Sequence, residues 1–198
     1  GFGSGTRLTT GLRLGCTTCF FGGGLVPASL GAGGSGSGFL GGGFSIGAGY
    51  GVHFAQQSAA SQVLNRVTGK DPSYILGTLT SNGGVWLINP YGIVFGKGAR
   101  IDVGSLVAST LDIADADFLA NRFNFTATGP AGASVVNQGA IRTSFGGRAW
   151  LLGDQVRNEG LVEAPGGSIV LAAGKSVEIV DSGTPNVVVE VSAPENRA

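Results

Sequence analysis

The sequence holds few residues whose types and spacing could carry out chemistry. Cys16 and Cys19 have the C-x-x-C spacing of a metal-binding or thiol-redox pair. A zinc site needs two further ligands, and the one histidine of the sequence is His53, while a thioredoxin-type site needs a βαβ unit around the cysteines. We therefore expect no metal, no cofactor and no redox chemistry at these residues.

Two other patterns resemble sites only formally. Asp112, Asp115 and Asp117 are clustered as in a weak calcium site or a glycosidase pair, but calcium needs more converging oxygens, and we expect a solvated loop face. Residues 36–41 match the dinucleotide fingerprint G-x-G-x-x-G, yet no strand precedes them and no helix follows. We expect the protein not to be an enzyme. Some polysaccharide lyases and hydrolases fold as β-helices, the architecture that the repeat described below predicts for this chain. A carbohydrate-active enzyme therefore stays the alternative.

Composition limits the class of protein. Twelve basic and twelve acidic residues give zero net charge, so nucleic acid is not an expected partner. Charged residues make up 12% and 38 residues are glycine, which favours many tight turns over exposed helices. No apolar run reaches the length of about 18 residues that a membrane-spanning helix needs. Residues 1–42 are an atypical Gly-rich segment, expected to be disordered or to substitute for a cap, and residues 43–198 read as one β domain.

A repeat predicts the architecture of that domain. Val135, Val156 and Val177 are 21 residues apart, and other positions repeat with them. The matching pairs are Asn137/Asn158, Gly139/Gly160, Ile141/Val162 and Gly153/Gly174. A period in the twenties indicates stacked units, and short strands joined by Gly or Asn corners favour the coils of an all-β, right-handed parallel β-helix. Asn137 and Asn158 would form a side-chain ladder, and residues 111–126 would be a small hairpin or insertion outside the helix.

The segment Asn89-Pro90-Tyr91-Gly92 lies between two apolar runs, residues 85–88 and 93–95. Asn can hydrogen-bond its own backbone, Pro fixes φ near −65° and Gly accepts positive φ, so this segment predicts a tight corner.

Five blocks of residues 44–196 resemble, in order, the secretion domain of two-partner-secretion exoproteins, which include filamentous haemagglutinins, high-molecular-weight adhesins, haemolysins and contact-dependent toxins. Two departures are Tyr91, where the family usually has Asn, and the absence of a second Asn-Pro-Asn-Leu motif. The blocks are residues 44–46 (FSI), 64–69 (LNRVTG), 82–96 (NGGVWLINPYGIVFG), 106–113 (LVASTLDI) and 192–196 (SAPEN).

The resemblance implies a partner and a route. The domain would direct a longer exoprotein through a cognate outer-membrane β-barrel transporter, by binding the periplasmic domains of the transporter, and the downstream passenger of the same chain would follow it out of the cell. We expect a monomer, secreted or held at the bacterial surface, that binds no nucleic acid. An adhesive module that binds a host ligand directly is a further alternative. Transporter recognition or folding nucleation is assigned to Asn89, Pro90, Gly92, Ile93, Asn65 and Arg66.

Overall fold

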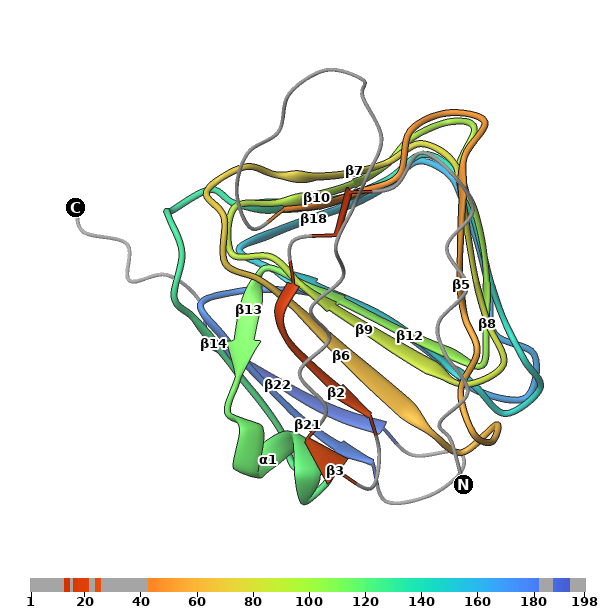
Figure 1. Cartoon of the computed structure of the whole chain (residues 1–198). Helices are drawn as coiled ribbons and strands as arrows, with labels where there is room; N and C mark the ends of the chain where they lie inside the picture. The colour runs from red at the N-terminus through yellow and green to blue at the C-terminus, as the bar shows by residue number, and fades with distance from the viewer. Residues whose placement is uncertain (1–12, 15, 22–23, 26–42, 182–186, 193–198) are drawn as a thin grey trace.

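In the computed structural model, the described residues are 13–14, 16–21, 24–25, 43–181 and 187–192. From residue 44 the chain winds through successive coils, and Figure 1 shows their triangular outline, with a different sheet along each side. The first face contains β7 (Ser73–Ile75), β10 (Ile93–Phe95), β15 (Ser134–Asn137) and β18 (Gln155–Asn158). The second contains β5 (Gly51–Phe54), β8 (Thr78–Ser81), β11 (Arg100–Val103), β16 (Ala140–Thr143) and β19 (Leu161–Glu163). The third contains β6 (Gln62–Val67), β9 (Gly84–Ile88), β12 (Ser105–Ser109), β17 (Arg148–Gly153) and β20 (Ser168–Ala173).

Within each face, neighbouring strands come from successive coils and pair in parallel. Val135 lies opposite Val156 and Ile141 opposite Val162, as the 21-residue repeat predicts. The right-handed parallel β-helix expected from the sequence is thus the fold of the described chain, with the handedness that parallel crossovers almost always take.

The repeat fails at Val177. This residue lies in β21 (Ser176–Asp181), which pairs antiparallel with β14 (Phe123–Ala127) and places Val177 opposite Phe125. The chain has left the coil after Gly174, so the third valine of the repeat belongs to a different sheet from the first two.

That fourth sheet, here the outer sheet, lies outside the solenoid beside the third face (Figure 1). Its strand order is β13 (Leu111–Ile113), β14, β21 and β22 (Val187–Ser192), and the short helix α1 (Asp115–Leu119) joins β13 to β14. The predicted insertion at residues 111–126 is therefore present as a strand–helix–strand unit. The sequence did not predict the second hairpin, β21–β22, which completes the sheet.

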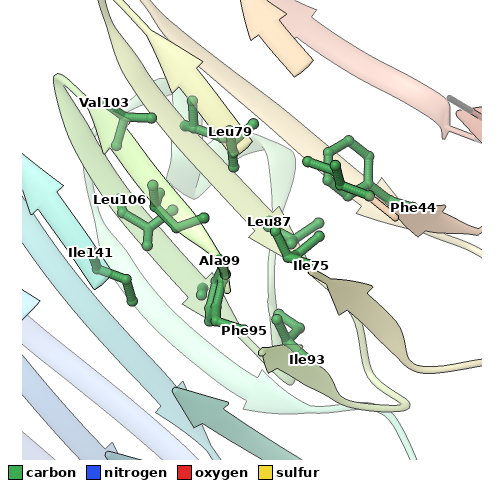
Figure 2. Close-up of a cluster of buried hydrophobic side chains, with 14 of the residues drawn as sticks. Phe44, Ile75, Leu79, Leu87, Ile93, Phe95, Ala99, Val103, Leu106 and Ile141 are labelled. Atoms are coloured by element: carbon green, nitrogen blue, oxygen red, sulfur yellow. The ribbon is translucent and has the colours of Figure 1, made fainter. Parts of the chain in front are cut away.

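Two cores share the third face. Alternate side chains of its strands, such as Leu87 and Leu106, point into the solenoid, where they meet the inner faces of the other two sheets (Figure 2). The intervening residues Trp86 and Ile88 point outward into a second core beneath the outer sheet. Because both faces are covered, β9 is buried at all five positions, which explains its continuous apolar run.

The second core is rich in aromatic rings. Trp86 meets Phe118 edge-on at 5.0 Å, and Phe123 meets Trp150 edge-on at 5.1 Å. Each indole N–H has a hydrogen-bond partner, Gln62 Oε1 for Trp86 and Ser168 Oγ for Trp150. These contacts join the outer sheet to several coils at once.

At the N-terminal end, β4 (Phe44–Ser45) pairs with β1 (Arg13–Leu14). β2 (Cys16–Phe21) pairs antiparallel with β6 and with β3 (Gly24–Leu25), so it extends the third face beyond the first coil. The other residues of 1–42 lie outside the described part of the chain.

Glycines form a column at the corner between the second and third faces. A Cβ added to Gly104 would meet the backbone of Gly83, one added to Gly147 would meet the carbonyl oxygen of Gly104, and one added to Gly167 would meet that of Gly147. Successive coils thus touch backbone to backbone here, which only glycine permits.

We expect Gly147→Ala to lower the free energy of unfolding by about 2–3 kcal/mol, because its methyl group would force adjacent coils apart. Gly98→Ala is the matched control, since a Cβ there would make only ordinary van der Waals contact, and its effect should stay within about 1 kcal/mol. Urea unfolding followed by tryptophan fluorescence measures both. Equal stability of the two variants would contradict the close packing of this corner.

Candidate functional site

Asn89 forms the corner between the third face of one coil and the first face of the next. Its side-chain Oδ1 accepts a hydrogen bond from the Tyr91 N–H at 2.9 Å, and its carbonyl oxygen accepts one from the Gly92 N–H at 3.1 Å. Gly92 has φ +123°, a conformation that favours glycine. The predicted turn is therefore present.

The same asparagine joins three successive corners. Its Nδ2 donates to the Asp71 carbonyl oxygen at 3.0 Å and to Ser73 Oγ at 2.9 Å, in the corner before it. Its backbone N–H donates to the carbonyl oxygen of Ser109, in the corner after it, at 2.9 Å. Asn89 is fully buried, so its polar atoms serve the coil stack in the folded domain.

The rest of the motif is also largely covered. Ile93 is fully buried in the solenoid interior, and Gly92 packs between Pro72 and the carbonyl oxygen of Ser134. The backbone of Gly129, where the chain returns from the outer sheet, lies directly against Pro90. Pro90 and Tyr91 are partly exposed and supply the accessible surface of the motif.

Asn65 and Arg66 are neighbours in β6 but lie on opposite faces. Asn65 is buried in register with Leu87, and its Nδ2 donates to the Trp86 carbonyl oxygen at 3.2 Å. The hydrogen bonds of the Asn89 side chain run to Asp71, Ser73 and Tyr91 rather than to either of these two residues. The structure therefore separates the predicted site into a corner at Asn89 and an ion-pair cluster around Arg66.

Arg66 clasps the insertion to the first coil. Its guanidinium donates to Asp112 Oδ1 at 2.8 Å, to Asp115 Oδ1 at 2.9 Å and to the Ile113 carbonyl oxygen at 2.7 Å. Burial lowers the pKa of Arg66, but the hydrogen bonds and charges of Asp112 and Asp115 outweigh burial and raise that pKa above its usual value. Two members of the aspartate cluster thus act as partners of an arginine, and Asp117 pairs with Arg122 at 2.7 Å.

Asn137 and Asn158 meet in register on the first face. Asn137 Nδ2 donates to Asn158 Oδ1 at 2.8 Å and to the Leu161 carbonyl oxygen at 3.2 Å, while its Oδ1 accepts from the Gly139 N–H at 3.1 Å. The pair forms a ladder step between two coils.

Sequence reasoning missed Asp154. This residue connects Gly132, where the chain re-enters the solenoid after the insertion, with Lys175, where the chain leaves the solenoid for β21. Its Oδ2 accepts a hydrogen bond from the Gly132 N–H and lies 3.0 Å from Lys175 Nζ. The Gly132 hydrogen bond, followed by Lys175, lowers the pKa of Asp154 below its usual value. No signal in the sequence marks this residue, because its partners lie 22 and 21 positions away and meet only after the coils stack.

The other candidate residues form no catalytic arrangement among the described side chains. His53 is exposed and its Nδ1 lies 2.8 Å from Thr80 Oγ1. Cys16 and Cys19 lie in β2, but their side chains, like residues 36–41 and 193–196 as a whole, are outside the described part. Within that part, no group of three or more His, Cys, Asp or Glu is placed to hold a metal ion, and no helix is long and apolar enough to span a membrane.

Comparisons with known proteins agree on one family. Residues 42–197 match the model of the TPS (two-partner secretion) secretion domain. The crystal structure of the HMW1 secretion domain from Haemophilus influenzae superposes with a TM-score of 0.70 and 40% identity, covering 78% of this chain and 42% of that one. A heme/hemopexin-binding protein of Haemophilus influenzae is 37% identical over 138 residues, and a second protein of that name is 40% identical over 83 residues. These stretches cover 66% and 42% of this chain but only 15% and 9% of those relatives.

We expect Arg66→Ala to lower the free energy of unfolding by about 2 kcal/mol, because it leaves the partly buried Asp112 carboxylate and the Ile113 carbonyl oxygen without their donor. Arg66→Lys should restore only part of this, since lysine lacks the planar fork. Arg122→Ala is the control: its side chain is 58% exposed, so its loss should cost about 0.5 kcal/mol or less. Denaturant unfolding of the three variants measures the differences, and equal effects of Arg66→Ala and Arg122→Ala would contradict the clasp.

Because of Asp154, we expect the free energy of unfolding of the domain to fall in acid. Because folding lowers the pKa of Asp154, the unfolded chain takes up the proton first as the pH falls through about 4. The free energy of unfolding that this residue contributes is therefore full near neutral pH and declines below that value. Asp154→Asn should be less stable at pH 7 by about 1–2 kcal/mol, and the difference from the native chain should shrink towards pH 2. A difference independent of pH would rule out this role.

Proposed function

This chain belongs to the family of TPS secretion domains, and from that premise we propose that it directs a longer exoprotein through a cognate outer-membrane β-barrel transporter. The match of residues 42–197 to the family model is the observation that carries this proposal. Exoproteins of this family are secreted across the outer membrane. We place the finished protein outside the cell or on its surface, as a monomer.

The activity of the complete exoprotein is a separate matter. The chain spans 15% of one heme/hemopexin-binding relative and 9% of the other, so most of such a protein lies outside the domain. We assign the domain to export and the activity of the exoprotein to its downstream passenger. Neither enzymatic activity nor direct adhesion to a host ligand is part of this proposal.

Recognition by the transporter takes place before the solenoid is complete. In the folded domain Asn89 and Ile93 have no exposed surface, and Arg66 is engaged with the insertion. An unfolded chain, in contrast, offers extended segments that add to an exposed sheet edge, where main-chain hydrogen bonds give affinity and alternate side chains give specificity. The periplasmic domains of the transporter would supply that edge.

The Asn89 corner acts in folding outside the cell. It links the corners of three coils through Asp71, Ser73 and Ser109, so its formation sets the register of several strands at once. Each stacked coil then buries apolar side chains, which makes the outward movement of the chain favourable without nucleotide hydrolysis.

Deletion of the domain tests its proposed role in targeting the exoprotein to the transporter. Removing residues 43–198 from the exoprotein should abolish export through the cognate transporter, measured as exoprotein in the medium and on the cell surface. Normal export of the deleted protein would overturn the proposal. Release of reducing sugar from polysaccharides by the purified domain would instead favour the enzyme alternative.

The role of the corner is tested with Asn89→Ala. We expect this variant to lose about 2–3 kcal/mol of unfolding free energy, because buried partners lose their donor and acceptor, and its export should fall together with its refolding rate. Tyr91→Ala keeps the backbone turn and removes a partly exposed ring, so stability should change by about 1 kcal/mol or less and export should persist. Stopped-flow refolding and a secretion assay measure the two properties.

Two outcomes would contradict this role. An Asn89→Ala domain that refolds like the native one but is not exported would mean that the transporter reads Asn89 directly. An Asn89→Ala domain that refolds slowly but is exported normally would mean that the corner does not drive export.

A further inference from the structure

A row of polar side chains crosses the outer side of the second face from coil to coil. Each of the five strands of this sheet contributes one side chain, and each side chain lies in register with the next. In chain order the row is His53, Thr80, Asp102, Arg142 and Glu163. His53 Nδ1 lies 2.8 Å from Thr80 Oγ1. Arg142 Nε donates to Glu163 Oε2 at 2.6 Å. The outer sheet lies beside the third face and does not cover this row (Figure 1).

The charges on this face balance. Arg100 and Asp102 are the exposed residues of β11, where they alternate with buried ones. Arg142 and Glu163 form an ion pair whose side chains are 60% and 44% exposed. Two positive and two negative groups produce no net field that would attract a polyanion. The face instead offers hydrogen-bond donors and acceptors side by side, which suits a ligand rich in hydroxyl groups, since each hydroxyl both donates and accepts.

An exposed aromatic ring stands at each of two corners that border this face. Tyr50 is 49% exposed at the corner before β5, and Phe145 is 87% exposed at the corner after β16. Figure 1 shows these corners at opposite ends of the second-face strands. An edge of each ring packs on a glycine. A Cβ added to Gly47 would lie 3.2 Å from Tyr50 Cδ2, and a Cβ on Gly166 would lie 2.7 Å from Phe145 Cε2. Both rings are therefore held in place without being buried.

The turn that carries Phe145 does not itself require an aromatic residue. Its Gly147 N–H donates to the Ser144 carbonyl oxygen at 2.9 Å, and the turn of the next coil closes in the same way between residues 164 and 167. That second turn has Pro165 where the first has Phe145, and each turn continues with a glycine of positive φ. Because the Phe145 ring stays exposed, it gains little from the hydrophobic effect in the folded chain. The ring is thus available to a ligand.

The spacing of these features fits an extended sugar chain. The two rings are separated by three strand spacings of roughly 4.8 Å and by about six residues along the strands, which places them roughly 20–25 Å apart. A β-1,4-linked polysaccharide is a flat ribbon that advances by about 5 Å per sugar, close to the spacing between strands. The C–H groups on its sugar faces stack on electron-rich aromatic faces, and its hydroxyl groups lie along its edges.

We propose that the outer side of the second face, between Tyr50 and Phe145, binds a neutral β-1,4-linked polysaccharide outside the cell. The two rings stack on sugar units near the ends of the bound segment. The row from Thr80 to Glu163 hydrogen-bonds the hydroxyl groups between them. This activity goes beyond export, because it belongs to the folded domain and needs no transporter, and it involves no cleavage of the glycan.

The test titrates the purified 198-residue chain with two soluble probes, cellohexaose and N-acetylchitohexaose, and follows backbone amide signals by NMR. We expect at least one probe to bind with a Kd of about 1 mM or tighter. Amide signals of β8, β11 and β16 should shift, and those of β14 and β21 in the outer sheet should not. A native chain that binds neither probe at about 10 mM would overturn the proposal.

Ring variants locate the site. Tyr50→Ala and Phe145→Ala should each weaken binding roughly threefold to tenfold, because each removes one stacking partner. Phe145→Pro should weaken binding equally while keeping the turn chemistry that the next coil uses. Tyr74→Ala is the matched control: Tyr74 is also 49% exposed, but it lies in β7 on the first face, so its loss should leave the affinity unchanged. Tryptophan fluorescence checks that each variant is folded.

A second pair of variants tests the polar row. Arg142→Ala should weaken binding, whereas Arg122→Ala should not, although the Arg122 side chain is similarly exposed at 58% and also forms an ion pair. Equal effects within either matched pair would overturn the proposed site. Tighter binding of an anionic chain, measured with a heparin hexasaccharide, would also overturn it, because the arginines alone would then attract the ligand.

Discussion

The structure depends on the stacking of one coil directly on the next at the spacing of a parallel β-ladder, roughly 4.8 Å. At this distance every inward side chain meets its equivalent one coil away, so Val135 packs over Val156 and Ile141 over Val162. The same distance leaves no room for a Cβ where corners touch, which requires the glycine column through Gly147. Apolar interior, strand register and glycine corners are therefore consequences of one geometric constraint.

Stacking alone would leave apolar side chains exposed on the outer side of the third face, and the outer sheet covers them. Trp86 and Trp150 point outward and are buried only because the strand–helix–strand insertion and the β21–β22 hairpin cover them. The cover is held at both ends of the coil stack: Arg66 ties its beginning to the first coil, and Asp154 connects Gly132, after the insertion, with Lys175, before β21. Charged contacts thus hold the outer sheet in place at its edges, and the buried aromatic rings pack at the centre of the core beneath it.

The sequence predicted those parts of the structure that local residue types determine. The corner at Asn89-Pro90-Tyr91-Gly92 follows from turn chemistry and the 21-residue register from periodicity, while the insertion that begins at Leu111 follows from a local change in composition. What it could not predict depends on distant pairing: Val177 fits the repeat yet lies in the outer sheet opposite Phe125, and the partners of Asp154 and Arg66 come together only after several coils have stacked. For the same reason the six residues grouped as one site from their family blocks divide into a buried corner and an arginine clasp.

The burial of Asn89 limits when a binding partner could contact its side chain. In the folded state the side-chain amide of Asn89 is hydrogen-bonded to Asp71, Ser73 and the Tyr91 N–H, so its polar atoms stabilise the stacked coils. A partner that senses Asn89 must meet the chain before those bonds form, whereas a partner that meets the finished domain meets Pro90, Tyr91 and the strand edges of the last coil. Burial at the corner therefore confines any contact with Asn89 to the unfolded or partly folded chain, while Pro90 and Tyr91 stay accessible after folding.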